Sequence, residues 1–407
     1  MNELTKKDAI VVFLAFAFAY FFSALIRAIT ATLSPTLTEE FDLSARQLGL
    51  LAGGYFLGFA ATQLPLGGLL DKYGPKRVLL SFLSVAVLGC IAFSAAGSFE
   101  GLLMARVMSG VGVSACLMAP LTGYRRWISP AGQLRANSWM LMTGSLGMVG
   151  ATLPVQWLAP ILGWRALFWI MAAMVVFAML LIAWKVPDTP TVAADTAVPR
   201  SYREVWRHPY FKKMIPLGFF TYGGLLAIQT LWVIPWMIRV TGYSPWEAAQ
   251  GLFWINVAML GTFWTWGLLN PWLVRKGYSA DRLIARGVPL SFVLLIGIIA
   301  GGEALGQATA WLWALYCMSS TFVALAQPAV GMMFPGELAG RALSAYNLVI
   351  FSGVFAMQWG IGLMVDGLMA LGWSEPGAFQ GAMTVFLLGT VGAYLYFLSA
   401  KSHNQKP

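Results

Sequence analysis

The chain has 407 residues, of which 59% are hydrophobic and only 10% are charged. A soluble globular protein carries about 25% charged residues, so this chain has too few charges to cover a water-facing surface of its size. Disorder is excluded, because disordered chains combine low hydrophobicity with high charge. The apolar residues form long continuous runs, which indicates membrane-spanning helices and disfavours both an ordinary soluble enzyme and a membrane β-barrel.

The apolar runs predict twelve membrane spans, since each span needs roughly 20 apolar residues. The expected spans are 9–34, 47–70, 78–97, 101–123, 136–159, 164–186, 214–238, 248–270, 284–302, 308–332, 342–368 and 377–399. The first run is interpreted as a span and not as a signal peptide, because no small-residue cleavage site follows it. The longest polar interruption predicts a cytoplasmic linker at 187–213, between an N-terminal six-helix half at 1–186 and a C-terminal six-helix half at 214–407.

The chain has a net charge of +10, and its basic residues lie mainly in the predicted loops. With the N-terminus inside, all but five of the 26 Lys and Arg residues fall in cytoplasmic segments. The five others are Arg27, Arg46, Arg106, Arg165 and Arg239. The positive-inside rule therefore predicts that both termini are cytoplasmic, and it explains the basic excess without nucleic acid. The compact loops favour a bacterial inner membrane.

The residues that carry cofactor and enzyme chemistry form no recognisable pattern. Cys90, Cys116 and Cys317 all lie inside apolar stretches, where they form neither a disulfide framework nor a metal-ligand spacing. No phosphate-binding glycine loop, zinc pattern or nucleophile elbow occurs. We therefore expect no cofactor, no metal and no enzyme activity.

Short motifs repeat at about half the chain length. Gly68–Asp71 precedes Lys76 and Arg77, and Gly267–Asn270 precedes Arg275–Lys276 at the same spacing. Gln156–Trp157 in the fifth predicted span also recurs as Gln358–Trp359 in the eleventh. Both matches indicate a duplicated six-helix unit.

The most specific motif joins the second and third spans. Residues 67–77 read Gly-Gly-Leu-Leu-Asp-Lys-Tyr-Gly-Pro-Lys-Arg. This segment resembles the G-x-x-x-D-R/K-x-G-x-K/R-R/K signature of the major facilitator superfamily, and Arg106–Gly112 resembles that family's R-x-x-x-G-x-G element. The resemblance implies an all-α membrane protein of twelve transmembrane helices in two pseudo-symmetric halves. It also implies alternating access to a central site.

The motif residues are expected to control the conformation of the transporter. Gly67 would let helices approach closely. Asp71 would accept hydrogen bonds from the N-terminus of a neighbouring helix or pair with a basic residue, and Gly74 would permit a tight turn. The alternative is a plain basic loop. The full gating set is Gly67, Asp71, Lys72, Gly74, Lys76, Arg77 and Arg106.

The first span suggests the kind of substrate. Ser23–Pro35, with Arg27, and Glu39–Ser44 resemble the first span and loop of the family's anion:cation symporter group. That group often has an acid before the arginine, where this chain has Ile26, and a glutamate in span four, where it has Val113 and Ser114. The resemblance therefore implies anion recognition, whereas uniport, exchange and symport all remain open.

Charged side chains inside a bilayer are costly, so Arg27 and Arg106 are candidate functional residues. An anionic substrate would provide the missing partner, because a guanidinium binds carboxylate or phosphate with two hydrogen bonds. The alternatives are snorkelling to the interface for Arg27 and a structural contact for Arg106. For Asp366, near the end of span eleven, a helix-end role is favoured over proton coupling. The substrate-binding candidates are Tyr20, Arg27, Gln229, Trp232, Tyr316 and Asn347.

These observations predict a secondary active or facilitative transporter of a small organic anion. An exporter of amphiphilic or aromatic compounds is the first alternative, because the second half is rich in tryptophan. A membrane sensor that transports nothing is the second. The expected partners are a small-molecule substrate, with an anion favoured, and the lipid bilayer. Nucleic acid is not expected, and the predicted state is a monomer.

Overall fold

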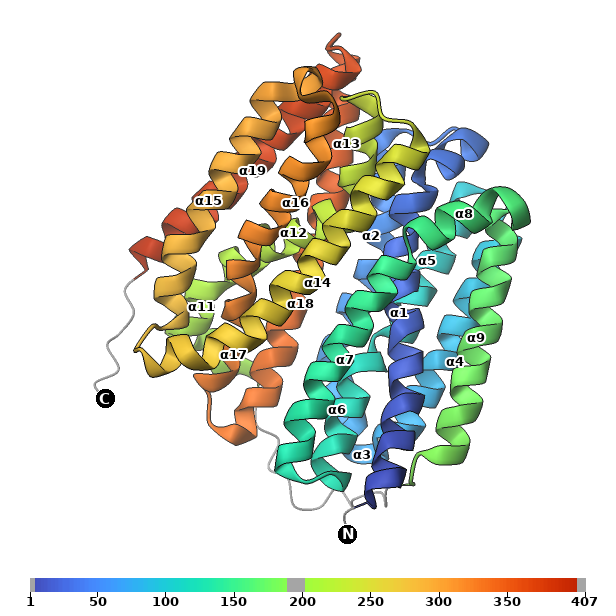
Figure 1. Ribbon diagram of the computed structural model, residues 1–407, viewed down its shortest axis with the longest axis vertical. Helices are drawn as coiled ribbons and strands as arrows, with labels where there is room; N and C mark the ends of the chain where they lie inside the picture. Colours follow the sequence, from blue (N-terminus) through green and yellow to red (C-terminus); the bar gives the residue numbers. More distant parts are fainter. Residues whose placement is uncertain (1–3, 189–201, 401–407) are drawn as a thin grey trace. The chain divides into compact units, whose positions relative to one another are not determined.

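The computed structural model describes residues 4–188 and 202–400, and these residues are almost entirely helical (Figure 1). The helices are α1 (Lys6–Phe41), α2 (Ala45–Ala61), α3 (Gln63–Tyr73), α4 (Pro75–Ala95), α5 (Phe99–Val113), α6 (Ala115–Trp127), α7 (Pro130–Gly150), α8 (Leu153–Leu162), α9 (Trp164–Lys185), α10 (Tyr202–Arg207), α11 (Pro209–Pro216), α12 (Gly223–Ala227), α13 (Val233–Arg239), α14 (Pro245–Arg275), α15 (Ala280–Gly301), α16 (Thr309–Ser320), α17 (Ala326–Met332), α18 (Gly336–Ala370) and α19 (Glu375–Ser399). Two π-helical turns, Leu217–Tyr222 and Ile228–Trp232, interrupt the α11–α13 segment.

Each predicted span falls on one helix or on consecutive helices. Nine stretches of the described chain are long and apolar enough to cross a membrane, or ten if the bent α7–α8 pair is one span. Ala280–Met332 is one such stretch, but it contains two predicted spans that are separated where Gly302 and Gly306 have positive φ. The second predicted span is divided at Thr62 into α2 and α3. The prediction of an all-helical, multi-pass membrane fold is confirmed.

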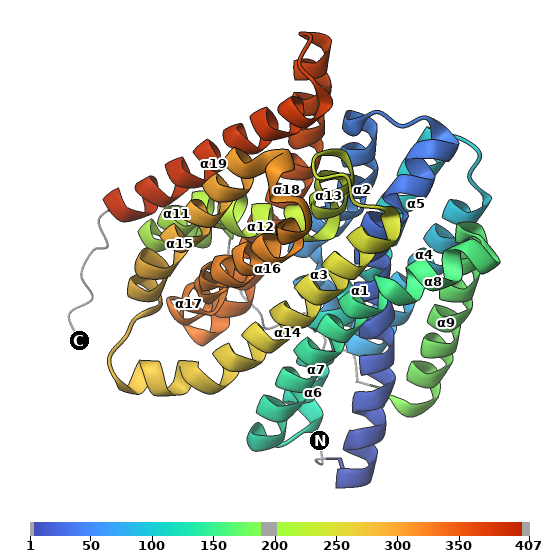
Figure 2. The same cartoon turned by 45° about the horizontal axis from the view of Figure 1, so that its top comes forward.

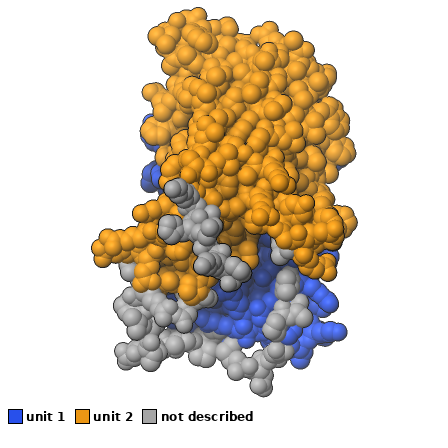
Figure 3. All heavy atoms as spheres, turned by 90° about the vertical axis from the view of Figure 1, so that its left-hand side faces the viewer, with its two compact units in different colours: residues 1–33, 54–198 blue, residues 34–53, 199–407 orange. Residues whose placement is uncertain are grey.

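The chain forms two compact units, which Figure 3 shows in different colours. Unit 1 consists of Met1–Leu33 and Gly54–Val198, and unit 2 consists of Ser34–Gly53 and Pro199–Pro407. Ser34–Gly53, from the predicted N-terminal half, thus belongs to the same unit as the C-terminal half.

The predicted linker at 187–213 is partly helical. Residues 189–201 lie outside the described residues, as do Lys401 and Lys406 of the predicted charge pattern. Tyr202–Arg207 forms α10, and α11 begins at Pro209, five residues before the expected start of the seventh span. Proline is well placed there, because the first helical position needs no N–H donor.

Glycines of α5 bring the helices of unit 1 into close contact. A Cβ added to Gly112 would lie 2.1 Å from the backbone nitrogen of Ala86 in α4, and one on Gly110 would lie 1.9 Å from the carbonyl oxygen of Tyr55 in α2. The two glycines of the R-x-x-x-G-x-G element therefore allow α5 to approach two neighbours at backbone distance.

In unit 2, a partly buried ion pair joins α11 to α15. The Lys213 Nζ lies 2.8 Å from the Asp281 Oδ2, and the Tyr210 hydroxyl donates to the other carboxylate oxygen at 2.7 Å. Helix α15 also packs against α16 and α19 (Figure 2). Asp281 lies in the first turn of α15, where a negative charge favours the helix.

Replacing Gly110 with alanine should destabilise the protein by about 1–3 kcal/mol, the usual cost of overpacking a tight contact. The new methyl group would collide with backbone, which cannot rotate away. Thermal unfolding of the purified protein in detergent measures the effect. Gly261→Ala in α14 is the matched control, because a Cβ there meets nothing within 4 Å. Equal melting temperatures for both variants would contradict the prediction.

Candidate functional site: an arginine–tyrosine cluster in unit 1

Helix α1 presents Tyr20 and Arg27 on the same face, because residues seven apart in a helix are separated by about two turns. The Tyr20 ring packs against Gly144 of α7, where a Cβ would lie 2.6 Å from a ring carbon. The half-buried guanidinium of Arg27 lies close enough to the hydroxyls of Tyr20 and Tyr55 to interact electrostatically with both. We call Tyr20, Arg27, Tyr55 and Arg106 the arginine–tyrosine cluster.

Arg106 of α5 is fully buried and holds the backbone of α1 beside Arg27. Its Nη1 donates to the carbonyl oxygen of Ile26 at 2.8 Å, and its Nη2 donates to the carbonyl oxygen of Arg27 at 3.5 Å. The centre of the Arg106 guanidinium lies 4.9 Å from the centroid of the Tyr55 ring, as in a cation–π contact. Arg106 thereby positions both the α1 backbone and the Tyr55 ring.

The cluster carries two positive charges without a negative partner. Within residues 4–188 and 202–400, neither arginine forms an ion pair with a carboxylate. The Nε atoms of Arg27 and Arg106, the Tyr55 hydroxyl and the Ser23 hydroxyl are buried without hydrogen-bond partners. Unpaired buried charges and donors are costly, so the arrangement is suited to an anion that accepts hydrogen bonds.

A second polar network lies in unit 2, at the π-helical turn Ile228–Trp232. Gln229 donates from Nε2 to the Asn256 Oδ1 at 2.7 Å, and Gln358 donates to the Thr230 hydroxyl at 3.0 Å. Trp232 is fully buried, and its indole nitrogen donates to the backbone oxygen of Gln358 at 3.2 Å. Such turns recur at functional sites, because the wider turn reorients the side chains that follow it.

The other two predicted binding residues of unit 2 lie in separate groups. Tyr316 is buried edge-on against Trp313, with ring centroids 5.4 Å apart. Asn347 accepts a hydrogen bond from Gln327 at 2.6 Å. Within the described chain, no hydrogen bond joins either residue to Gln229. Within unit 1 the structure therefore brings the binding candidates Tyr20 and Arg27 together beside Arg106 of the gating set. Within unit 2 it places Gln229 and Trp232 on one π-helical turn and leaves Tyr316 and Asn347 in separate groups.

The motif between α3 and α4 agrees only in part with its expected roles. Gly74 forms the predicted turn with φ 79° and ψ 161°, a conformation that favours glycine. Lys76 pairs with Asp188 at 3.4 Å, and the Nζ of Lys72 lies 5.0 Å from the centroid of the Tyr73 ring. Arg77 is exposed.

The expected close approach at Gly67 is wrong for this structure, because a Cβ there would meet nothing within 4 Å. Asp71 is exposed and caps no helix in the described part of the chain. Asp366 does cap a helix, because its two carboxylate oxygens accept hydrogen bonds from the backbone N–H groups of Ala45 and Arg46, both at 3.0 Å. The helix-end role expected of Asp366 is thus a cap on α2, a helix far away in sequence.

The sequence of residues 16–357 matches the family model of the Major Facilitator Superfamily. The chain belongs to this superfamily. It is a multi-pass membrane transporter, and its helical architecture and the residue 67–77 motif agree with that assignment.

Three known members of the superfamily show the range of similarity. A 3-(3-hydroxy-phenyl)propionate transporter of Escherichia coli (strain K12) is 26% identical over 375 residues, which cover 86% of this chain and 87% of that protein. The multidrug resistance protein MdtM of Salmonella typhimurium (strain LT2) is 26% identical over 369 residues, covering 83% and 82%. The crystal structure of a bacterial homologue of the human lysosomal transporter Spinster superposes with a TM-score of 0.76 at 19% identity, over 98% of both chains. This last similarity establishes the fold alone.

Replacing Tyr55 with phenylalanine should change the stability of the unliganded protein by less than the loss of one hydrogen bond, since the Tyr55 hydroxyl forms no hydrogen bond. Tyr394→Phe is the control. The Tyr394 hydroxyl donates to the carbonyl oxygen of Ala285, so its removal should cost about 1 kcal/mol. Thermal unfolding of both variants checks the expectation. A larger loss in Tyr55→Phe than in Tyr394→Phe would show that the Tyr55 hydroxyl supports the fold.

Proposed function

We propose that this transporter carries a small organic anion and that Arg27 binds the acidic group of the substrate. The supporting observation is the fully buried Arg106 beside the half-buried Arg27, neither of which has a carboxylate partner in the described chain. A carboxylate, sulfonate or phosphate would satisfy both the charge and the free donors. The substrate then offsets a desolvation cost that the unliganded protein bears.

The residues around Arg27 have different roles in this proposal. The hydroxyls of Tyr20 and Tyr55 hydrogen-bond the same acidic group, because both lie beside the Arg27 guanidinium. Arg106 is a positioning residue, since its Nη groups are already engaged with the α1 backbone. Gln229, Trp232, Tyr316 and Asn347 of unit 2 are proposed to contact the rest of the substrate during the transport cycle.

An aromatic or hydroxylated organic acid fits these groups best. Such a molecule has an acidic end for Arg27, and its polar or aromatic body suits amide and indole side chains. The relative from Escherichia coli is named for a substrate of this kind. We propose no proton carrier in the first unit, because Ile26, Val113 and Ser114 stand where the related symporters have acids. Uniport, exchange and symport with another ion are the remaining mechanisms.

The proposal places a monomeric transporter in the bacterial inner membrane, with both termini in the cytoplasm. The positive-inside distribution of Lys and Arg supports this orientation. The residue 67–77 motif is proposed to act in a different conformation from the one described, where Asp71 would meet a helix N-terminus. Export of amphiphilic or aromatic compounds is the second candidate, because the Salmonella relative is named a multidrug resistance protein.

A thermal-shift screen with the Arg27→Gln variant tests the proposed substrate class. The ligands are aromatic and aliphatic carboxylates, sugar acids, sulfonates and organic phosphates, beside cationic and neutral drugs. A ligand at 100 times its Kd should stabilise the parent protein by about 2.7 kcal/mol. We expect one class of anion to do so, and we expect Arg27→Gln to abolish the effect.

Arg282→Gln is the matched control for the loss of one positive charge, because Arg282 is exposed on α15 in unit 2. It should keep the anion-induced shift. An anion that stabilises the parent protein in this screen is then tested in liposome flux assays with and without a pH gradient. Stabilisation by cations or neutral aromatics alone, unchanged in Arg27→Gln, would contradict anion binding and favour the exporter.

A further inference from the structure

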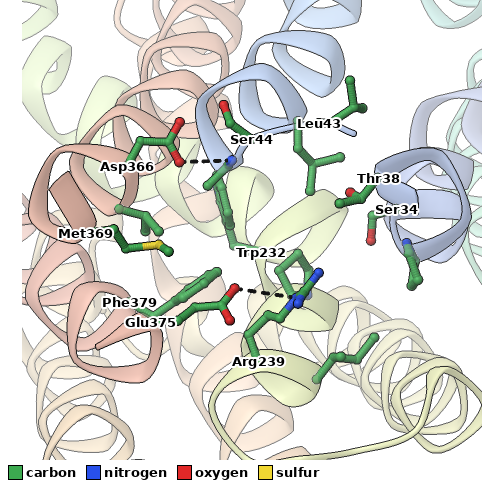
Figure 4. Close-up of a pocket in the computed structure, with 16 residues that line it drawn as sticks. Ser34, Thr38, Leu43, Ser44, Trp232, Arg239, Asp366, Met369, Glu375 and Phe379 are labelled. Atoms are coloured by element: carbon green, nitrogen blue, oxygen red, sulfur yellow. Dashed lines mark hydrogen bonds and ion pairs between the residues drawn. The ribbon is translucent and has the colours of Figure 1, made fainter. Parts of the chain in front are cut away.

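A cavity of about 270 Å³ lies within unit 2 (Figure 4). All the residues that line it belong to this unit, and they come from segments 34–48, 232–239, 365–369 and 375–379. Ligand pockets usually span about 300–1,000 Å³, so a cavity of this size suits a small molecule. Trp232 is the one lining residue that the cavity shares with the substrate contacts proposed above.

The cavity has a charged, partly exposed mouth and an apolar interior. The side chains of Arg239 and Glu375 are 47% and 38% exposed, and Met369 is also exposed. Trp232 and Phe379 are buried, and their rings meet edge to face with centroids 6.0 Å apart. An amphiphilic molecule would therefore keep its charged group at the mouth, while its apolar body leaves water for the interior.

Arg239 has hydrogen-bond donors that no described residue uses. Its Nε lies 3.6 Å from the Glu375 Oε1, and within residues 4–188 and 202–400 its guanidinium has no further ion pair or hydrogen bond. A guanidinium carries five N–H donors, so both Nη groups of Arg239 remain open. A partly exposed pair with one long contact is also weak, and Glu375 therefore does not exclude a second acid from Arg239.

The other polar groups of the cavity add donors more than acceptors. Both carboxylate oxygens of Asp366 already accept hydrogen bonds from the first N–H groups of α2. The Thr38 hydroxyl also lines the cavity and has no hydrogen-bond partner in the described chain. The hydrogen-bonding capacity that remains is mainly that of donors, which favours a ligand with acceptor oxygens.

We propose that this cavity binds a small amphiphilic organic anion, a carboxylate with an apolar or aromatic body. The acid accepts two hydrogen bonds from the Nη groups of Arg239, and the body packs against Trp232 and Phe379. This site gives a role to Arg239, one of the five basic residues outside the predicted cytoplasmic segments. It goes beyond the proposed function, because it holds its ligand whether or not Arg27 binds one.

Protection of an introduced cysteine measures binding at the cavity directly. Met369→Cys places an exposed thiol at the cavity, whereas the native Cys90, Cys116 and Cys317 are fully buried. The full-length protein in detergent is labelled with a small polar maleimide, with and without 3-phenylpropionate. At ten times its Kd this acid should slow the labelling about tenfold, because only the free protein reacts.

Two probes of similar shape identify the group that binds. 3-Phenylpropionamide is neutral and 3-phenylpropylamine is a cation, and both carry the same ring on a similar chain. Neither should protect Met369→Cys at the concentration at which the acid does. Leu371→Cys is the control for thiol reactivity, because Leu371 is exposed just after α18 and does not line the cavity. Its labelling should not respond to the acid.

Three variants of Met369→Cys test the charges. Arg239→Gln should abolish protection by the acid. Arg46→Gln is the matched control, since Arg46 is exposed in the same unit and does not line the cavity, and it should keep the protection. Glu375→Gln should lower the Kd of the acid about two- to fivefold, because it removes a like charge beside the bound carboxylate.

Absence of protection by the acid, equal protection by the amide, or protection that survives Arg239→Gln would overturn the anion site. Protection by the amine that is lost in Glu375→Gln would show a cation site and would overturn it as well. The probe series and Glu375→Gln both test the charge of the ligand, so the proposal stays falsifiable if Arg239→Gln folds poorly.

The Arg27→Gln variant separates this site from the proposed substrate site. Protection of Met369→Cys should be the same with and without Arg27→Gln, because the cavity belongs to unit 2. Loss of protection in Arg27→Gln would overturn the proposal. Intact protection together with a failed anion screen at Arg27 would refute only the proposed substrate site.

Discussion

Unit 1 holds two guanidinium groups, the fully buried Arg106 and the half-buried Arg27, and neither has a carboxylate partner among the described residues. The packing of this unit depends on how they are compensated. Such charges are tolerated in a membrane protein only when carbonyls, rings or a ligand compensate them. Arg106 uses two carbonyl oxygens of α1 and the Tyr55 ring, so α1, α2 and α5 must pack at close range. Arg27 has only neighbouring hydroxyls, and it is the charge that the fold leaves for a ligand.

Close packing around these charges is achieved by glycine. Gly110 brings α5 against the backbone of α2 at Tyr55, and this contact carries the Tyr55 ring under Arg106. The part of α2 that belongs to unit 1 therefore supports the arginine–tyrosine cluster.

The carboxylate cap on α2 could not be predicted from the sequence. Asp366 was expected only at a helix end, and in the structure it accepts hydrogen bonds from the first N–H groups of α2. A cap needs an acid and a free helix start within hydrogen-bonding distance, and the two lie about 320 residues apart here. Local sequence identifies acids and helix starts separately, but only the packing of α2 on α18 pairs them.

The sequence by itself determined the twelve apolar spans, the turn at Gly74 and the superfamily, because long hydrophobic runs and local turn chemistry do not depend on distant residues. It also marked Arg27 and Arg106, since charges stand out inside apolar segments. Only the tertiary structure decided that Tyr55 joins them, that residues 34–53 pack with the second unit and that Asp366 caps α2. Those outcomes depend on contacts between helices far apart in the chain, and helical periodicity carries no information about which faces will meet.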